Sequence, residues 1–265
     1  MKRFPLWSWF WIVLGAAYFI VPLISTFIFS LEQKRDEIGF TAYHNAFSDP
    51  EFAKTFTFSL ELAVLTIIVG IVLIVPTAYW VHLRLPQVRP VIELITLLPF
   101  VIPAIILVFG LITVYSKPPL LLTTNKVTTT GLLVGGYLVL SMPYLYRSVD
   151  GGLRAMNVRA LTEAAQSLGA NWFTILFRII LPGLRTALLS GAMLTLAIVV
   201  GEVVFATYLG LDTFGPYLWL LGQHRAYEPA ALTIVSFGLT WAAMGIIALI
   251  TSGVSGRQAQ IATGH

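Results

Sequence analysis

Long apolar runs recur along this chain, and each is close to the length that an α-helix needs to cross a lipid bilayer. Such a helix takes about 20 mostly apolar residues, because each residue advances it by about 1.5 Å through a hydrocarbon core about 30 Å thick. The runs predict the spans Phe4–Phe29, Phe58–Val81, Ile92–Tyr115, Thr130–Tyr146, Ala187–Gly210 and Ala230–Ser252. The expected fold is therefore all-α, a polytopic transmembrane helical bundle of about six spans. The fourth span is the least regular, since Gly135, Gly136 and Pro143 weaken a helix.

The charge content argues against a water-soluble globular domain. Only 11% of the residues are charged, whereas a soluble domain averages about 25%. The chain has no cysteine, so disulfides, thiolate metal sites and cysteine nucleophiles are excluded. The net charge of +4 is accounted for by arginines in the loops on one side of a membrane, and we expect no binding to nucleic acid.

The distribution of basic residues predicts that both termini lie in the cytoplasm. Lysine and arginine concentrate in the short cytoplasmic loops of membrane proteins. With both ends inside, the inner segments carry Lys2, Arg3, Arg84, Arg89, Arg147, Arg154, Arg159, Arg178, Arg185 and Arg257. In the outer segment over residues 31–55, acids outnumber bases. The N-terminal apolar run exceeds the roughly 7–15 residues of a cleaved signal peptide, so we expect an uncleaved first span.

The one long inner segment, residues 147–185, is patterned as a helix, a glycine turn and a second helix. Asn157 can cap the first helix, which Gly169 can end in a left-handed conformation. Asn171 can cap the second helix, and Pro182 can stop or kink it.

Small and apolar side chains crowd this turn: Ala164, Ala165, Leu168, Ala170, Trp172, Phe173, Ile175 and Leu176. An exposed apolar turn of this kind usually marks an interaction site. Two interpretations are open at this point. In the first, the loop packs back on its own membrane bundle. In the second, the apolar turn docks on a separate protein.

The segment EAAQSLGANWFTILFRIILP resembles the signature of binding-protein-dependent ABC importer permeases. That signature reads Glu-Ala-Ala, three residues, Gly, nine residues, Ile, one residue, Leu-Pro. The matching positions here are Glu163, Ala164, Ala165, Gly169, Ile179, Leu181 and Pro182. The wider resemblance extends over nearly the whole chain and is greatest to the spermidine/putrescine group.

This resemblance implies a single permease domain over residues 1–265 in the bacterial inner membrane, with a coupling loop over 147–185. In that family, a short helix at this glycine sits in a groove of a cytoplasmic ATPase subunit. The resemblance also implies a second permease subunit and an extracytoplasmic substrate-binding protein as partners.

Residue by residue, the resemblance implies that Glu163 faces the ATPase or caps the coupling helix. Ala164 and Ala165 would allow close approach. Gly169 would form the turn, and Pro182 would set the exit toward the fifth span.

No catalytic or metal site is predicted. The chain has no G-x-x-x-x-G-K-[ST] loop, so ATP would be bound by the partner ATPase, and we expect no cofactor in this chain. The histidines His44, His82, His224 and His265 are scattered and form no H-E-x-x-H motif. We therefore expect that the chain is not an enzyme.

Glu202 interrupts an otherwise charge-free run within the fifth predicted span. A carboxylate inside a span costs about 2.5–3.5 kcal/mol on insertion scales, so it predicts a polar interior and a place in the translocation pathway. There it would offer a cationic cargo a transient partner. The alternative is a hydrogen bond that ties helices together.

The predicted function is a permease subunit of an ATP-driven importer of a small solute, with a polyamine such as spermidine or putrescine as the first candidate cargo. Ferric iron, thiamine and an oxyanion stay open as alternatives within the same class. From a different class, the alternative is an ATP-independent secondary transporter or channel, against which the complete loop signature argues.

Overall fold

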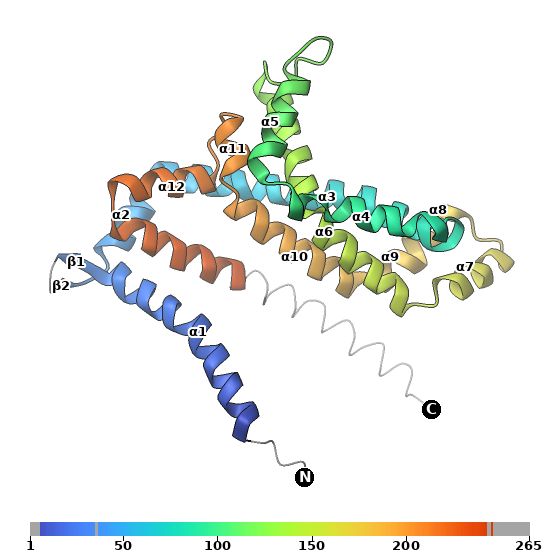
Figure 1. Ribbon diagram of the computed structural model, residues 1–265, viewed down its shortest axis with the longest axis horizontal. Coiled ribbons are helices and arrows are strands. Elements are labelled where there is room, and N and C mark those ends of the chain that lie inside the picture. The colour runs from blue at the N-terminus through green and yellow to red at the C-terminus, as the bar shows by residue number, and fades with distance from the viewer. Residues whose placement is uncertain (1–5, 35–36, 243–244, 246–265) are drawn as a thin grey trace. The chain divides into compact units, whose positions relative to one another are not determined.

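The computed structural model describes residues 6–34, 37–242 and 245 (Figure 1). They are mainly helical, with one short antiparallel ribbon formed by β1 (Glu32–Lys34) and β2 (Glu37–Ile38). The described chain divides into two compact units. One, the unit of the two chain ends, contains the described residues up to Lys54 and those from Tyr217 to 242, and the other contains residues Thr55 to Pro216.

The unit of the two chain ends contains α1 (Leu6–Leu31), the ribbon, α2 (Thr41–Ser48) and a helix over residues 227–242. Within it, the Phe29 and Tyr227 rings pack with their centroids 5.0 Å apart. The sixth predicted span, Ala230–Ser252, begins in the helix over 227–242, and the rest of that span lies outside the described residues.

The second unit is built on long helices. α3 (Pro50–Arg84) starts at a proline, and the Asp49 carboxylate before it accepts a hydrogen bond from the Glu51 amide at 3.0 Å. α6 (Lys126–Ala155) is continuous through the fourth predicted span, so the glycines and the proline within it do not break the helix. α10 (Arg185–Gly201) packs along α6, and a β-carbon on Gly191 would meet the Leu145 side chain at 2.6 Å.

The third predicted span is broken into two helices. It consists of α4 (Arg89–Val101) and α5 (Ala104–Tyr115), whose axes differ by 104°. The break falls at Pro103, which has no backbone N–H and forces the preceding residue out of the helical region. Ile102 is accordingly extended, with ψ 120°.

The fifth predicted span is also interrupted. α10 ends at Gly201, and the chain resumes as the short helix α11 (Val204–Tyr208) before α12 (Phe214–His224). Apolar composition alone did not reveal this interruption, because the residues on both sides of it are equally apolar.

The predicted all-helical membrane architecture is confirmed. By length and hydropathy, two described helices qualify as membrane spans, Trp9–Leu31 and Pro50–Arg84. Up to four qualify if the helices over Pro86–Val101 and Ala104–Tyr115 count as one bent span and those over Trp172–Gly183 and Arg185–Gly201 as another. α6 does not meet this criterion, and its threonines and glycines lower its mean hydropathy.

Two buried apolar clusters hold the second unit together. The first joins α3, α6 and α10 to the inner loop and includes Tyr79, Leu145 and Ile180. The second surrounds the α10–α11 break and includes Leu133, Tyr137 and Phe205. Each cluster therefore supports one of the regions that the sequence singled out.

Candidate functional site

The inner loop folds as its capping residues predict. α7 (Val158–Ser167) begins where the Asn157 side chain accepts a hydrogen bond from the Ala160 amide at 3.3 Å. Gly169 then adopts φ +79°, a left-handed conformation that costs other residues about 1–2 kcal/mol. α8 (Trp172–Ile175) is capped by Asn171, whose side chain accepts from the Thr174 amide at 2.8 Å. Both caps and the glycine turn are confirmed, and α7 ends one residue earlier than expected.

The second helix of the loop is less regular than its sequence indicates. After α8, the chain forms a π-helical segment, η2 (Leu176–Ile180), and then α9 (Leu181–Gly183). Pro182 lies within α9, next to a 73° bend between the loop helices and α10. Pro182 is therefore located at the exit toward the fifth span, as expected.

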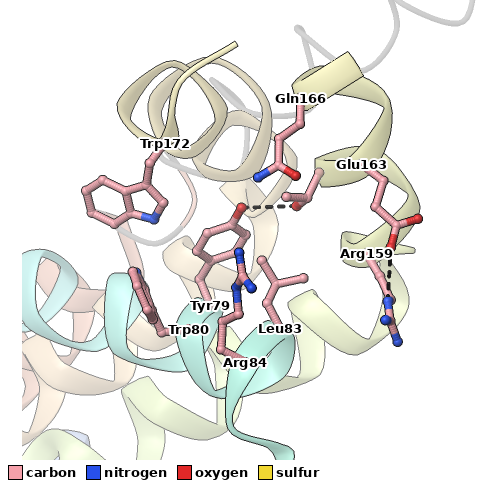
Figure 2. Close-up of a pocket in the computed structure, with 9 residues that line it drawn as sticks. Tyr79, Trp80, Leu83, Arg84, Arg159, Glu163, Gln166 and Trp172 are labelled. Carbon is pink, nitrogen blue, oxygen red and sulfur yellow. Dashed lines mark hydrogen bonds and ion pairs between the residues drawn. The ribbon is translucent and has the colours of Figure 1, made fainter. Parts of the chain in front are cut away.

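One side of the loop packs on the chain's own core. Ala165, Ile175 and Leu176 are all buried in the cluster that contains Tyr79. The Tyr79 hydroxyl lies 3.0 Å from the Thr162 hydroxyl, and this buried hydrogen bond joins α3 to α7 (Figure 2). The self-packing interpretation is therefore correct for this side of the loop.

The tip of the loop remains exposed. Leu168 retains 88% of its accessible surface and Phe173 retains 65%, although both are large apolar residues. Ala164 and Glu163 share this exposed side, whereas Ala165 faces inward, so its small side chain allows close packing within the chain. Glu163 forms an exposed ion pair with Arg159 at 3.1 Å, and asparagines provide the caps of α7 and α8.

A cluster of charged side chains joins α3, α4 and α6 where the inner loop begins. The Asp150 carboxylate lies 2.8 Å from His82 Nε2, 3.0 Å from Arg89 and 2.8 Å from Arg154. The Glu93 carboxylate accepts hydrogen bonds from both arginines, at 3.0 and 2.9 Å. Sequence reasoning treated these arginines only as topology signals. The one available clue was an acid, Asp150, among the basic residues of the inner segment.

The partners of Asp150 control its ionisation. Burial by itself raises the pKa of this carboxyl, but the hydrogen bond from His82 and the charges of Arg89 and Arg154 outweigh burial. The pKa of Asp150 is therefore lower than that of an ordinary aspartate. Asp150 is ionised at neutral pH and holds the ends of three helices together.

Glu202 lies in the break between α10 and α11 and not inside a continuous span. It is 9% exposed, and its carboxylate accepts hydrogen bonds from the amides of Val204 at 2.7 Å and Phe205 at 3.0 Å. The Ala206 amide lies farther away, at 3.4 Å. The carboxylate thus accepts hydrogen bonds from N–H groups at the start of α11 that have no partner within the helix.

Two further polar groups near Glu202 are buried. The hydroxyls of Tyr137 and Thr213 have no hydrogen-bond partner of good geometry within the described residues. The Glu202 carboxylate is directed at backbone amides. This arrangement favours a role in holding the chain together at the break over a role in binding cargo.

Comparison with known proteins gives consistent matches. Residues 70–259 match the family described as "Binding-protein-dependent transport system inner membrane component". A spermidine/putrescine transport system permease protein of Haemophilus influenzae is 27% identical over 184 residues, which cover 63% of this chain and 62% of the relative. A probable sulfate transport system permease protein of Nephroselmis olivacea is 29% identical over 245 residues, covering 86% and 83%. The match thus covers less than two thirds of the Haemophilus relative.

Among solved structures, a bacterial ABC transporter involved in the import of the acidic polysaccharide alginate matches with a TM-score of 0.68. The match covers 95% of this chain and 96% of the other, at 19% identity. At that identity, the likeness establishes a shared fold.

We predict that Asp150→Asn lowers the free energy of unfolding by about 1–2 kcal/mol, since it removes the carboxylate that bonds His82 and leaves Glu93 as the remaining acid beside Arg89 and Arg154. The pKa of Asp150 is lower in the folded chain than in the unfolded chain, where it is about 3.9. The ionised carboxylate therefore stabilises the fold fully above the unfolded pKa, and this stabilisation is lost as the pH falls through the folded pKa. Denaturant unfolding in detergent at neutral and acidic pH measures both effects. Glu163→Gln, which breaks an exposed pair, is the control, and an equal loss in both variants would contradict the prediction.

We predict that Glu202→Gln destabilises the chain by about 1–2 kcal/mol, because the new amide places N–H donors against the backbone donors of α11. Thermal unfolding in detergent gives the measurement, and Glu61→Gln, at an exposed position on α3, is the control. Unchanged stability together with a selective loss of uptake would restore the pathway role of Glu202.

Proposed function

Because this chain belongs to the family of binding-protein-dependent transport system inner membrane components, we propose that it forms one half of the membrane pathway of an ATP-driven importer. Family membership makes it a transport subunit and not an enzyme. The observation that carries the proposal is the inner loop, in which the signature residues fold into a packed base and an exposed tip.

The exposed tip is suited to receive force from an ATPase subunit. Leu168 and Phe173 present apolar surface that a protein groove would bury. Gly169 leaves open space at the turn, since a β-carbon there would meet no atom within 4 Å. We propose that this tip docks on the ATPase, and that ATP is bound by the ATPase and not by this chain.

The packed base provides a route for that force into the membrane. Displacement of α7 would pull on α3 through the Tyr79–Thr162 hydrogen bond and the surrounding core. Displacement of α8 would act on α10 through the 73° bend next to Pro182. Because close-packed cores transmit displacement and do not absorb it, movement of the tip would change how α3 and α10 lie against α6.

The proposed assembly follows from the same role. A second permease subunit completes the pathway, two ATPase subunits bind on the cytoplasmic side, and a substrate-binding protein docks on the outside. Both termini would then lie in the cytoplasm, with the arginine-rich loop facing the ATPases. The expected location is the bacterial inner membrane.

The first candidate cargo is a polyamine, which is supported by the spermidine/putrescine system for which the Haemophilus influenzae relative is named. The relative from Nephroselmis olivacea is named for sulfate and aligns over more of the chain. Ferric iron and thiamine remain alternatives. Glu202 gives a cation no advantage, because its carboxylate is held by backbone amides.

We predict that the purified chain alone hydrolyses no ATP, and that proteoliposomes take up labelled spermidine only when the second permease, the ATPase and a loaded binding protein are present. Labelled sulfate in parallel vesicles tests the cargo. Uptake by the isolated chain without an ATPase would support a secondary transporter and reject the proposed function.

We predict that Leu168→Ser lowers the affinity for the ATPase by about tenfold or more, since burial of a leucine side chain contributes about 1.5–3 kcal/mol. Folding should be unaffected, because this side chain is 88% exposed. Gly169→Val should also abolish co-purification, because valine is strained at the positive φ of this turn.

The control for both variants is Val127→Ser, which changes a 77% exposed residue at the far end of α6. Co-purification of the Leu168 and Gly169 variants at the level of this control would reject docking through the tip.

A further inference from the structure

A groove of about 370 Å³ lies beside the inner loop, between the last turns of α3 and the helices α7 and α8 (Figure 2). The Tyr79–Thr162 hydrogen bond lies in it. Figure 2 shows Trp80 and Trp172 on one side, with Arg84 rising from α3 between Tyr79 and Leu83. The groove therefore combines aromatic surface with a central guanidinium group.

One charged group that lines this groove has no ionic partner. Within the described part of the chain, Arg84 forms no ion pair. Glu163, the acid among the described lining residues, is already paired with Arg159. An arginine fork is suited to phosphate oxygens, which accept several hydrogen bonds at once.

An exposed apolar stripe on α3 leads to the groove. Leu65, Ile68, Val72 and Trp80 are between 45% and 63% exposed, and their spacing places them on one face of the helix. Trp80 belongs to both the stripe and the groove lining. The predicted second span ends at Val81, so Arg84 lies where phospholipid headgroups begin, and tryptophan is typical of that depth. The two features together fit one molecule that carries a phosphate on a long apolar chain.

We propose that this groove binds the headgroup of an anionic phospholipid of the cytoplasmic leaflet, with an acyl chain along the α3 stripe. The proposal rests on the orientation given under the proposed function. The phosphate would contact the Arg84 guanidinium from α3, with Gln166 of α7 nearby (Figure 2). The lipid would thereby bridge the joint at which the loop meets the membrane helices.

The test measures lipid retained by the full chain in detergent, using phosphatidylglycerol and phosphatidylcholine as probes and native mass spectrometry as the readout. We expect phosphatidylglycerol to be preferred and Arg84→Gln to weaken its binding about fivefold, as expected for one basic residue at an anionic surface. Arg84→Lys should retain part of the affinity. The matched control is Arg178→Gln, because Arg178 is an exposed arginine of the inner loop that does not line the groove.

A second arm separates a lipid from a free anion. Val72→Gln alters the stripe without touching the groove, and we expect it to weaken phosphatidylglycerol binding while inorganic phosphate fails to displace the lipid. Equal binding of both lipids, an equal loss in the Arg178 control, or displacement by inorganic phosphate would each overturn the proposal. Release of the lipid on addition of the ATPase subunit would also overturn it, since the groove would then be a protein-docking surface. None of these measurements depends on transport, so a negative result leaves the proposed function standing.

Discussion

The need to satisfy every buried backbone N–H group governs the unusual features of this structure. Inside a membrane no water is available to bond a free amide, so a helix can be interrupted only where other groups take over. At the first interruption, Pro103 has no N–H to satisfy. At the second, Glu202 bonds the amides at the start of α11. Each break is therefore possible because of one particular side chain.

The inner loop obeys the same requirement at the surface, and there it produces two different faces. Asn157 and Asn171 cap the two short helices, so neither depends on a partner protein to complete its first turn. The inward face is held by Ile175, Leu176 and the Tyr79–Thr162 hydrogen bond. The loop is thus folded on its own core before any partner binds, and its tip presents apolar surface to a partner.

Local signals were enough to predict the parts of the structure that depend on neighbouring residues. The asparagine caps and the turn at Gly169 each follow from the conformational preference of one residue type. The breaks near Pro103 and Glu202 escaped prediction because a hydropathy pattern records composition and not continuity. The cluster around Asp150 escaped because His82 is 68 positions away in the sequence, and one chain contains no sign of such a contact. The π-helical turn likewise has no signature in its residues.

The π-helical segment η2 explains why the spacing between Gly169 and Pro182 matters. A π-turn accommodates an extra residue in the helical ladder, and each residue of an α-helix turns the chain by about 100°. Removing one residue from Leu176–Ile180 would allow a regular α-helix and would leave the tip facing nearly the same way, whereas removing a residue from a regular α-helical part of the connection would rotate the tip by about a quarter turn relative to α10. The length of the connection around η2 therefore sets the direction in which Leu168 and Phe173 point. A change of side chain within this connection alters packing, whereas a change of length in its α-helical part redirects the tip.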